Sequence, residues 1–150
     1  NKEKIVLVRY GLEDMLRQLG MRRHCNESVF DICSVASVLG NFIAIFKSAG
    51  FAISGGVYPC FKDEEGFIQD VKRDLKEGLF SKTIIHPSQI EIINELYKVS
   101  ETELEEAVAI TQHTDGVFSQ NAKMAEVKTM TPFSQEIILR AKEYGVLTLP

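Results

Sequence analysis

The stretch GLFSKTIIHPSQIEIINELY, residues 78–97, decides the fold because an apolar strand in it passes directly into a helix. Residues 83–85 are β-branched and continuously apolar, which is typical of a parallel strand buried on both faces. Pro87 disfavours helical geometry at His86, yet its own fixed φ suits the first position of a helix. Apolar residues then recur at helical spacing to the end of the stretch. The stretch therefore predicts a βα unit.

The same unit is predicted twice upstream. KIVLVR, residues 4–9, is typical of a buried strand, and residues 27–50 predict a long helix of about twenty residues. FAISGGVY, residues 51–58, is the second strand, and Asp63 is the predicted N-cap of a helix that stops at Gly78. Strands that alternate with helices at this interval predict parallel pairing with helical crossovers.

The predicted units leave apolar surface that needs cover. The long helix carries its polar residues on one narrow stripe, so it should be covered on more than one side. Three parallel strands cannot close a barrel, and an open sheet leaves a face and two edges unprotected. The cover is either a further barrel half, a second copy of the chain, or elements exchanged between copies. The exposed sheet and the mostly apolar helix at Ser28–Ser48 both need cover, so we expect the chain to associate.

The pattern changes after the third unit. Ser100 and Glu103 form a capping box before a helix. Residues 113–132 are predicted to be mostly loop, and a last helix is predicted to start at Pro132. We therefore expect residues 1–99 to form the α/β part and residues 100–150 an appended helical arm or lid.

Composition sets the outer bounds. The chain has 150 residues, of which 45% are apolar and 25% charged, which suffices for a domain with its own core. Its net charge of −4 offers no basic surface for nucleic acid, and no apolar run reaches the length of a membrane span. Three cysteines, Cys25, Cys33 and Cys60, have no metal-binding spacing. We expect them to be reduced thiols in a cytoplasmic protein.

Three segments carry a resemblance to a known family. They are RYGLEDMLRQLG (9–20), GGVYPCFKDEEGF (55–67) and GLFSKTIIHPSQIEIIN (78–94). They resemble, in the same order, the F-G-x-E-D-x-x-x-x-L-G, D-x-V-Y-x-D-x-x-D-x-x-G-F and G-F-x-G-K-x-x-I-H-P-x-Q-I-x-x-I-N segments of the citrate lyase β-subunit and HpcH/HpaI aldolase family. The likeness covers most of the chain and only the second half of that family's barrel.

The resemblance implies a fold and an activity. The fold would be α/β, a partial TIM (β/α)8 barrel that comprises about the last three βα units and a C-terminal helical arm or lid. The activity would be that of a lyase or aldolase that uses Mg²⁺ or another divalent cation on a 2-oxo or 2-hydroxy acid or its CoA thioester. The active sites of such barrels lie at the C-terminal ends of the strands. The chain alone is expected to be inactive. It is expected to form a homo-oligomer or to pair with the other barrel half.

The resemblance also implies a metal ligand at Asp14, which matches the family's metal-binding aspartate. Magnesium prefers oxygen ligands and takes one or two carboxylates, so the adjacent Glu13 is a secondary candidate. The alternative is that both residues only complement the dipole of a helix N-terminus. The family's companion glutamate and substrate arginine belong to the first barrel half and have no counterpart in this chain.

Two further residues are site candidates. Glu126, in AKMAE at 122–126, matches the aspartate of the family's G-K-M-I-D segment, which can reach a neighbouring subunit's active site as an acid or base. His86 at the end of the third strand is a secondary candidate for acid or base chemistry. A structural role in shaping the strand-to-helix turn is the favoured reading for His86.

The chain departs from the family's pattern at two carboxylates. Gly55 and Cys60 stand where the family has aspartates. These departures support an alternative function, a non-catalytic barrel fragment that serves as an assembly or ligand-binding module. Lys82 flanks the third strand, where a solvated side chain is a more common outcome than contact with an anionic substrate.

Overall fold

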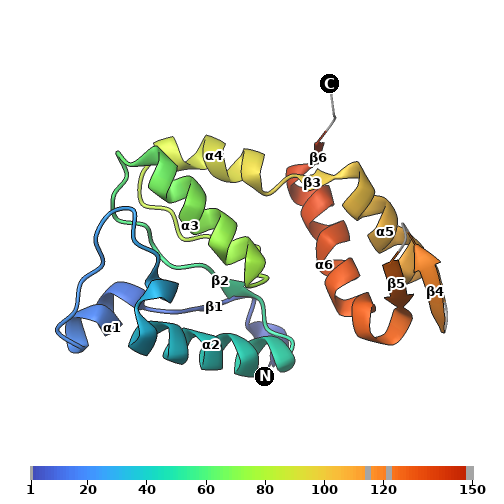
Figure 1. The fold of residues 1–150 in the computed structure, drawn as a ribbon, viewed down its shortest axis with the longest axis horizontal. Coiled ribbons are helices and arrows are strands. Elements are labelled where there is room, and N and C mark those ends of the chain that lie inside the picture. The colour runs from blue at the N-terminus through green and yellow to red at the C-terminus, as the bar shows by residue number, and fades with distance from the viewer. Residues whose placement is uncertain (1, 114–115, 121–122, 148–150) are drawn as a thin grey trace. The chain divides into compact units, whose positions relative to one another are not determined.

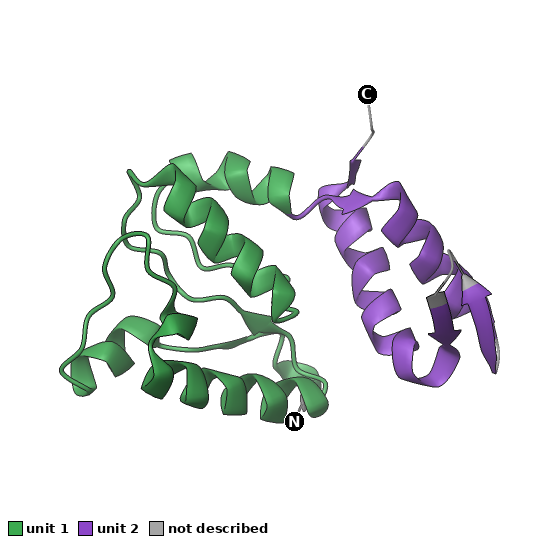
Figure 2. Cartoon of the chain, viewed as in Figure 1, with its two compact units in different colours: residues 1–96 green, residues 97–150 purple. Residues whose placement is uncertain are grey.

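The chain folds into two compact units in a computed structural model that describes residues 2–113, 116–120 and 123–147 (Figure 1). The first unit spans residues 1–96 and the second residues 97–150 (Figure 2). The structure thus divides the chain at the end of the helix that follows His86-Pro87. In the described part of the chain, no helix is long and apolar enough to cross a membrane.

Three short parallel segments form the centre of the first unit. Strand β1 (Val8–Arg9), which follows the 3₁₀ turn η1 (Lys2–Lys4), pairs in parallel with β2 (Ile53–Ser54), with Val8 opposite Ile53. Gly55 then forms a parallel bridge to Lys82, which belongs to the third predicted strand. The Gly55 N–H donates to the Ser81 carbonyl at 2.7 Å. The predicted parallel pairing of the three units is therefore confirmed.

The strands are shorter than predicted. The predicted strand at residues 4–9 is regular only at its last two residues, and the strand at 82–86 contributes only the Lys82 bridge. Val6 is 91% exposed and Ile85 is 51% exposed, so neither run is buried as expected. A parallel strand can pair along one edge alone, but it becomes fully buried only when neighbours cover it on both sides. The described residues supply such a neighbour on one side of each run.

Two helices connect β1 to β2. Helix α1 (Leu12–Gln18) follows β1, and α2 (Cys33–Ser48) follows a 3₁₀ turn, η2 (Val29–Asp31). The predicted long helix is therefore divided, because the Ser28 hydroxyl accepts from the Phe30 N–H and caps the short turn separately. Along α2 the apolar residues are buried on one stripe, namely Val35, Leu39 and Ile43.

Within the first unit, α2 is covered on one side only, so the expected cover of its other side would have to come from outside this unit. Val38 is 44% exposed and Ile45 63% exposed. Both lie away from the stripe that packs against α1 and β2. The uncovered face is the surface for which association was predicted.

Helix α3 (Glu64–Lys76) follows β2 as predicted. The Asp63 side chain caps it by accepting from the Gly66 N–H at 3.1 Å, and Gly78 has a left-handed φ of 71° after its end. Phe67 and Val71 are buried on its inner face. In Figure 1, β1 and β2 lie between α2 and α3.

Helix α4 (Ser88–Leu96) begins directly after Pro87, as the opening stretch predicted. The buried side chain of Gln89 holds this turn. Its Oε1 accepts from the Ile85 and His86 N–H groups at 3.0 and 3.3 Å, and its Nε2 donates to the Tyr58 carbonyl at 3.2 Å. One amide side chain thus joins the strand-to-helix turn to the loop after β2.

The second unit is built on two long helices. Helix α5 (Glu101–Gln112) has the predicted capping box of Ser100 and Glu103, and α6 (Val127–Tyr144) packs along it. Short strands β3 (Val99–Ser100) and β6 (Val146–Leu147) pair in parallel at the ends of these helices. Tyr97 packs edge-on against Tyr144 with ring centroids 5.0 Å apart.

The predicted loop at 113–132 is wrong over much of its length. Strands β4 (Val117–Gln120) and β5 (Lys123–Glu126) pair in antiparallel fashion, while residues 114, 115, 121 and 122 lie outside the described part. Helix α6 starts at Val127 and contains Pro132, which removes one intrahelical hydrogen bond. The Thr131 hydroxyl donates to the Val127 carbonyl at 2.6 Å, so a side chain supplies a hydrogen bond to the first turn of α6.

Replacement of Gln89 by leucine should destabilise the intact protein by about 1–3 kcal/mol, because one buried carbonyl and two part-buried N–H groups lose their partner. Urea unfolding measures the change. Ser88→Ala is the matched control, since it removes only one exposed hydroxyl from the same turn and should cost below about 1 kcal/mol. Equal effects of the two substitutions would contradict the role given to Gln89.

Candidate functional site

An open cavity of about 410 Å³ lies at the C-terminal ends of the parallel segments. Its lining comes from the end of β1, the first turn of α1, the loop after β2 and the third segment, namely Arg9, Tyr10, Gly11, Leu12, Glu13, Asp14, Val57 and Thr83. The ends of parallel strands meet at one edge of a sheet, where α/β folds place their ligands. The cavity is therefore the candidate functional site.

Glu13 and Asp14 bring carboxylates to this cavity from the first turn of α1. An Asp14 oxygen, Oδ1, lies 2.9 Å from the Arg17 guanidinium, and the two side chains are 72% and 77% exposed. Exposed pairs of this kind are weak, so the carboxylate can exchange this partner for another cation. The oxygen donors suit Mg²⁺. In the described residues no three acidic, histidine or cysteine side chains form a metal-binding group, so further ligands would come from elsewhere.

His86 is exposed and does not line the cavity. Its Nδ1 accepts from the Ser88 N–H at 3.2 Å and lies 2.8 Å from the Ser88 hydroxyl. Its ring stacks on Phe61 with centroids 4.5 Å apart. These contacts are those of a residue that shapes the start of α4, and they leave Nε2 for any proton exchange.

Glu126 ends β5 in the second unit and stands at the N-cap position of α6. Its Oε2 accepts from the Thr129 hydroxyl at 2.6 Å. This hydrogen bond orients the carboxylate within its own unit. Its role at an active site stays a prediction.

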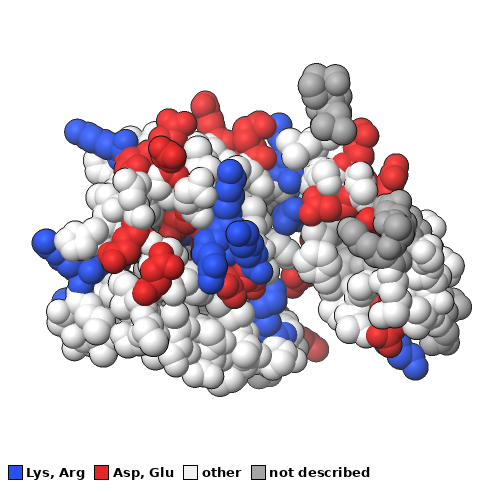
Figure 3. All heavy atoms as spheres, in the orientation of Figure 1, with Lys and Arg blue, Asp and Glu red and all other residues white. Residues whose placement is uncertain are grey.

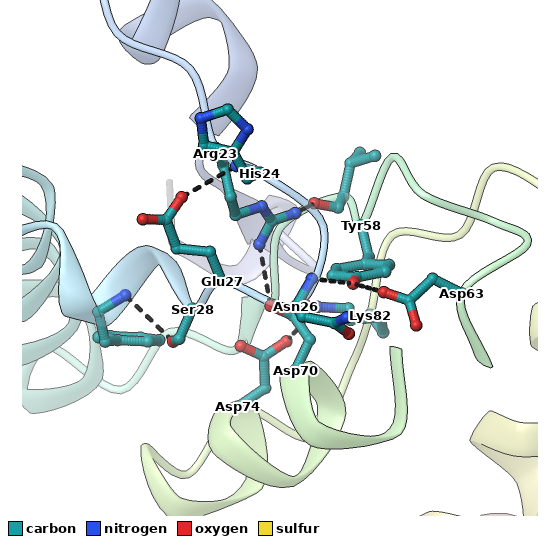
Figure 4. A network of polar contacts seen from close by, with 12 residues as sticks. Arg23, His24, Asn26, Glu27, Ser28, Tyr58, Asp63, Asp70, Asp74 and Lys82 are labelled. Carbon is teal, nitrogen blue, oxygen red and sulfur yellow. Dashed lines mark hydrogen bonds and ion pairs between the residues drawn. The ribbon is translucent and has the colours of Figure 1, made fainter. Parts of the chain in front are cut away.

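Arg23, Asp70, Asp74 and Lys82 form a buried network of four charges next to the loop after β2 (Figure 4). Lys82 forms ion pairs with Asp70 and, at 2.6 Å, with Asp74, and its side chain is only 1% exposed. Arg23 contacts Asp70 at 2.9 Å and donates to the Val57 carbonyl at 2.6 Å. The expectation of a solvated Lys82 is therefore wrong, because two carboxylates on the inner face of α3 draw its ammonium inward. On the outer face shown in Figure 3, by contrast, acidic and basic side chains of the first unit lie in the open next to one another.

Sequence reasoning missed this network, although a signal existed. Asp70 and Asp74 are one helical turn apart and share the buried side of α3 with Phe67 and Val71. Acidic residues on an apolar stripe are rarely buried without cations. The spacing of the two aspartates thus predicts basic partners for them, but it does not identify these partners as Arg23 and Lys82.

Burial raises the pKa of Asp74 to about 6, and the nearby Asp70 charge adds to this effect while Lys82 opposes it. Tyr58, beside the same network, donates to Asp63 at 2.5 Å. Burial first, and then this hydrogen bond, raise the pKa of Tyr58, while the same bond lowers the pKa of Asp63. The network therefore fixes carboxylates with different proton affinities close to the loop after β2.

The network explains why Gly55 stands where the family has an aspartate. A Cβ atom at Gly55 would lie 2.0 Å from Asp74 Oδ2 and 3.2 Å from Lys82 Cδ. No larger side chain fits while Asp74 and Lys82 keep their ion pair. This substitution is thus linked to a buried ion pair.

The second departure has a different cause. Cys60 forms a disulfide with Cys25, so the expectation of three reduced thiols is wrong for this pair, and Cys33 is a free, exposed thiol. The two bridged residues are separated by 35 positions, and their Cα atoms are 5.9 Å apart because the loops after α1 and β2 run side by side. Spacing alone gave no sign of this proximity.

Residues 1–146 match the model of a family described as C-C bond lyases of the TIM-barrel fold. The chain belongs to this family. The TIM-barrel fold class and the resemblance to citrate lyase β-subunits are thereby confirmed at the level of the family.

Curated relatives of the chain in this family are longer proteins. A (3S)-malyl-CoA thioesterase of Cereibacter sphaeroides is 34% identical over 95 residues, which are 63% of this chain and 32% of that protein. The citrate lyase subunit beta of Escherichia coli is 27% identical over 133 residues, which are 83% of this chain and 42% of that protein. The chain thus spans less than half the length of these relatives.

Solved structures show the same fold. The protein CitE from Mycobacterium tuberculosis, in complex with magnesium, acetoacetate and coenzyme A, superposes with a TM-score of 0.67 at 22% identity, over 89% of this chain and 51% of that one. A citrate lyase from Burkholderia xenovorans has a TM-score of 0.69 at 19% identity, over 95% of this chain and 47% of that one.

Substitution of Gly55 by alanine should destabilise the intact protein by about 1–3 kcal/mol, because the new methyl group overlaps the Asp74 carboxylate. Chemical denaturation checks the value. Gly40→Ala in α2 is the control. A Cβ there meets nothing within 4 Å, so alanine should be neutral or stabilising by up to about 1 kcal/mol. A Gly55→Ala protein as stable as the Gly40→Ala protein would contradict the packing described.

Asp74 should make stability fall as the pH rises from about 4 to above 6. Its pKa in the folded protein, about 6, exceeds the ordinary value of 3.8, so the folded state binds the extra proton in this range. The stabilisation by this proton is fully present below about pH 4 and disappears as the pH rises past about 6. Asp74→Asn should remove on the order of 1–3 kcal/mol of this pH dependence. Urea midpoints at four pH values measure it, and parallel curves for the two proteins would contradict the assignment.

Proposed function

We propose that the intact protein is a magnesium-dependent carbon-carbon lyase that acts on a 2-oxo or 2-hydroxy acid or its CoA thioester. Residues 1–99 would contribute the last barrel units and residues 100–150 a helical arm or lid. The observation that carries the proposal is the pair of carboxylates, Glu13 and Asp14, on the cavity at the C-terminal ends of the parallel segments. The magnesium, acetoacetate and coenzyme A bound in the related CitE structure support it.

Asp14 is the proposed metal ligand, and Glu13 is the secondary candidate. A bound Mg²⁺ would polarise a substrate carbonyl and stabilise the enolate left by bond cleavage. Asp14 would exchange its exposed Arg17 partner for the ion. Arg9 lines the same cavity and supplies a positive charge that attracts the carboxylate of an acid substrate.

Glu126 is the proposed acid or base, and its hydrogen bond from Thr129 holds the carboxylate in one orientation. In this proposal the lid brings Glu126 to an active site of the same or a neighbouring copy. His86 stays a secondary candidate. Its contacts with Ser88 and Phe61 favour a structural role.

The apolar strand residues indicate the partner surface. Val6, Ile84 and Ile85 are exposed although each lies in a predicted barrel strand. We propose that the remaining barrel half covers them, and that the complete protein forms a homo-oligomer through the exposed side of α2. Use of an acid or a CoA thioester agrees with a cytoplasmic enzyme.

A second candidate function rests on the two missing aspartates. Gly55 and Cys60 remove carboxylates from near the cavity mouth, and both are tied to other contacts, the Asp74–Lys82 pair and the disulfide. A chain that uses these positions for structure suits a non-catalytic module for assembly or ligand binding. Such a module would lack metal-dependent turnover.

Asp14→Asn in the intact protein should weaken Mg²⁺ binding and metal-dependent cleavage at least about a hundredfold, because the ion loses a charged ligand. Calorimetric titration with Mg²⁺ and acetoacetate measures binding, and product formation from (3S)-malyl-CoA and a panel of 2-hydroxy acids measures turnover. Glu64→Gln, an exposed carboxylate in the first turn of α3, is the matched control and should leave both unchanged. Unchanged values for Asp14→Asn would remove the metal assignment. No heat and no turnover in the unmodified protein would favour the non-catalytic module.

A further inference from the structure

We propose that the Cys25–Cys60 disulfide is a reversible redox site whose state sets the mobility of the loop at residues 57–63. In this proposal an external dithiol reduces the bond and an oxidant of the disulfide class restores it, while the first unit stays folded. The site is separate from the proposed lyase chemistry. It concerns the wall of the cavity and not the reacting groups.

The disulfide is accessible to a reductant. Cys25 is exposed and Cys60 half-buried, and both line an open, mainly apolar hollow of about 360 Å³. Lys62 and Asp63 also line the hollow, so one cation and one carboxylate lie near the disulfide. A nearby cation favours thiolates, which are both the attacking and the leaving groups in exchange. An incoming dithiol thus finds space next to the sulfur atoms, and the Lys62 cation offsets the Asp63 carboxylate there.

The reaction is balanced by thiol-disulfide exchange. A thiolate of the dithiol attacks one sulfur of the Cys25–Cys60 bond, forms a mixed disulfide and releases the other cysteine as a thiolate. The second thiol of the reductant then attacks the mixed disulfide. Two electrons and two protons pass to the chain, which gains two thiols, and the reductant leaves as a disulfide.

The fold has contacts that hold after the bond is cut. The Tyr58 hydroxyl accepts from the Asn26 N–H at 3.1 Å, and the Tyr58 carbonyl accepts from Gln89. Arg23 is bound to the Val57 carbonyl. These hydrogen bonds lie at the start of the loop and do not depend on the sulfur atoms. Reduction therefore frees the outer part of the loop without removing its base.

The outer part of the loop is connected to the candidate site by the residues next to it. Val57, the first residue of the loop, lines the cavity, and Phe61 in the middle of the loop stacks on His86. The disulfide joins the position next to Phe61 to the loop after α1. An oxidised chain thus also holds the middle of the loop at Cys60, whereas a reduced chain holds the loop only at its two ends, at Val57 and Tyr58 and at the α3 cap Asp63.

The test uses the intact, folded protein in buffers of stepped dithiothreitol and oxidised glutathione, with alkylation and mass spectrometry as the readout. We expect two alkyl groups to be added together, at Cys25 and Cys60, only after reduction, and to be absent again after reoxidation. Cys33 is alkylated in both states and serves as the internal reference. Hydrogen exchange of residues 60–62 should become at least about tenfold faster on reduction, with exchange in α2 unchanged.

Three variants sharpen the outcome. Cys25→Ser with Cys60→Ser should show the fast exchange in every buffer, whereas Cys33→Ser should behave as the unmodified protein. Lys62→Gln should slow reduction at neutral pH. The proposal is overturned if Cys25 and Cys60 are alkylated in the oxidised buffer, if reduction requires denaturant, or if loop exchange is the same in both states. None of these readouts depends on lyase activity, so they are independent of the proposed function.

Discussion

The buried ammonium of Lys82 is the contact on which the first unit depends. It lies between the carboxylates of Asp70 and Asp74 on α3, and it belongs to the segment that pairs with Gly55 after β2. A buried charge without a partner costs several kcal/mol. If α3 moved away from the segment that contains Lys82, the buried charges of both would therefore be left unpaired. Arg23 extends the same constraint to the loop of Val57. Ion pairs that do not line the cavity thus hold the segments that form its walls.

This arrangement separates support from chemistry. The carboxylates at the cavity, Glu13 and Asp14, are exposed, and Asp14 has only an exposed ion pair, whereas Asp70 and Asp74 are buried and paired with Lys82. A metal ligand must be able to give up water or a weak partner, and a support must not. Acidic side chains are therefore exposed at the cavity and buried in the ion-pair network.

The sequence was sufficient where short-range patterns act. Helix starts followed from local signals, as the Asp63 cap, the capping box of Ser100 and the His86-Pro87 turn illustrate. It was insufficient where partners are distant. The strand lengths depend on neighbours across the sheet, and the β4–β5 hairpin lacks the strong turn dipeptides that announce one. The carboxylates of the candidate site were predictable through the family motif, but the disulfide and the cations of the buried network join residues far apart in the chain and became visible only in the fold.

The fit between Gly55 and Asp74 also constrains how such a chain can change. An aspartate at position 55 would place its Cβ on the Asp74 carboxylate, so it is tolerated only after Asp74 has become smaller or moved. Loss of Asp74 in turn leaves Lys82 with a single carboxylate. Substitutions at positions 55, 74 and 82 are therefore epistatic, and the order in which they occur matters. An aspartate at position 55 would require Asp74 to be replaced or to shift first.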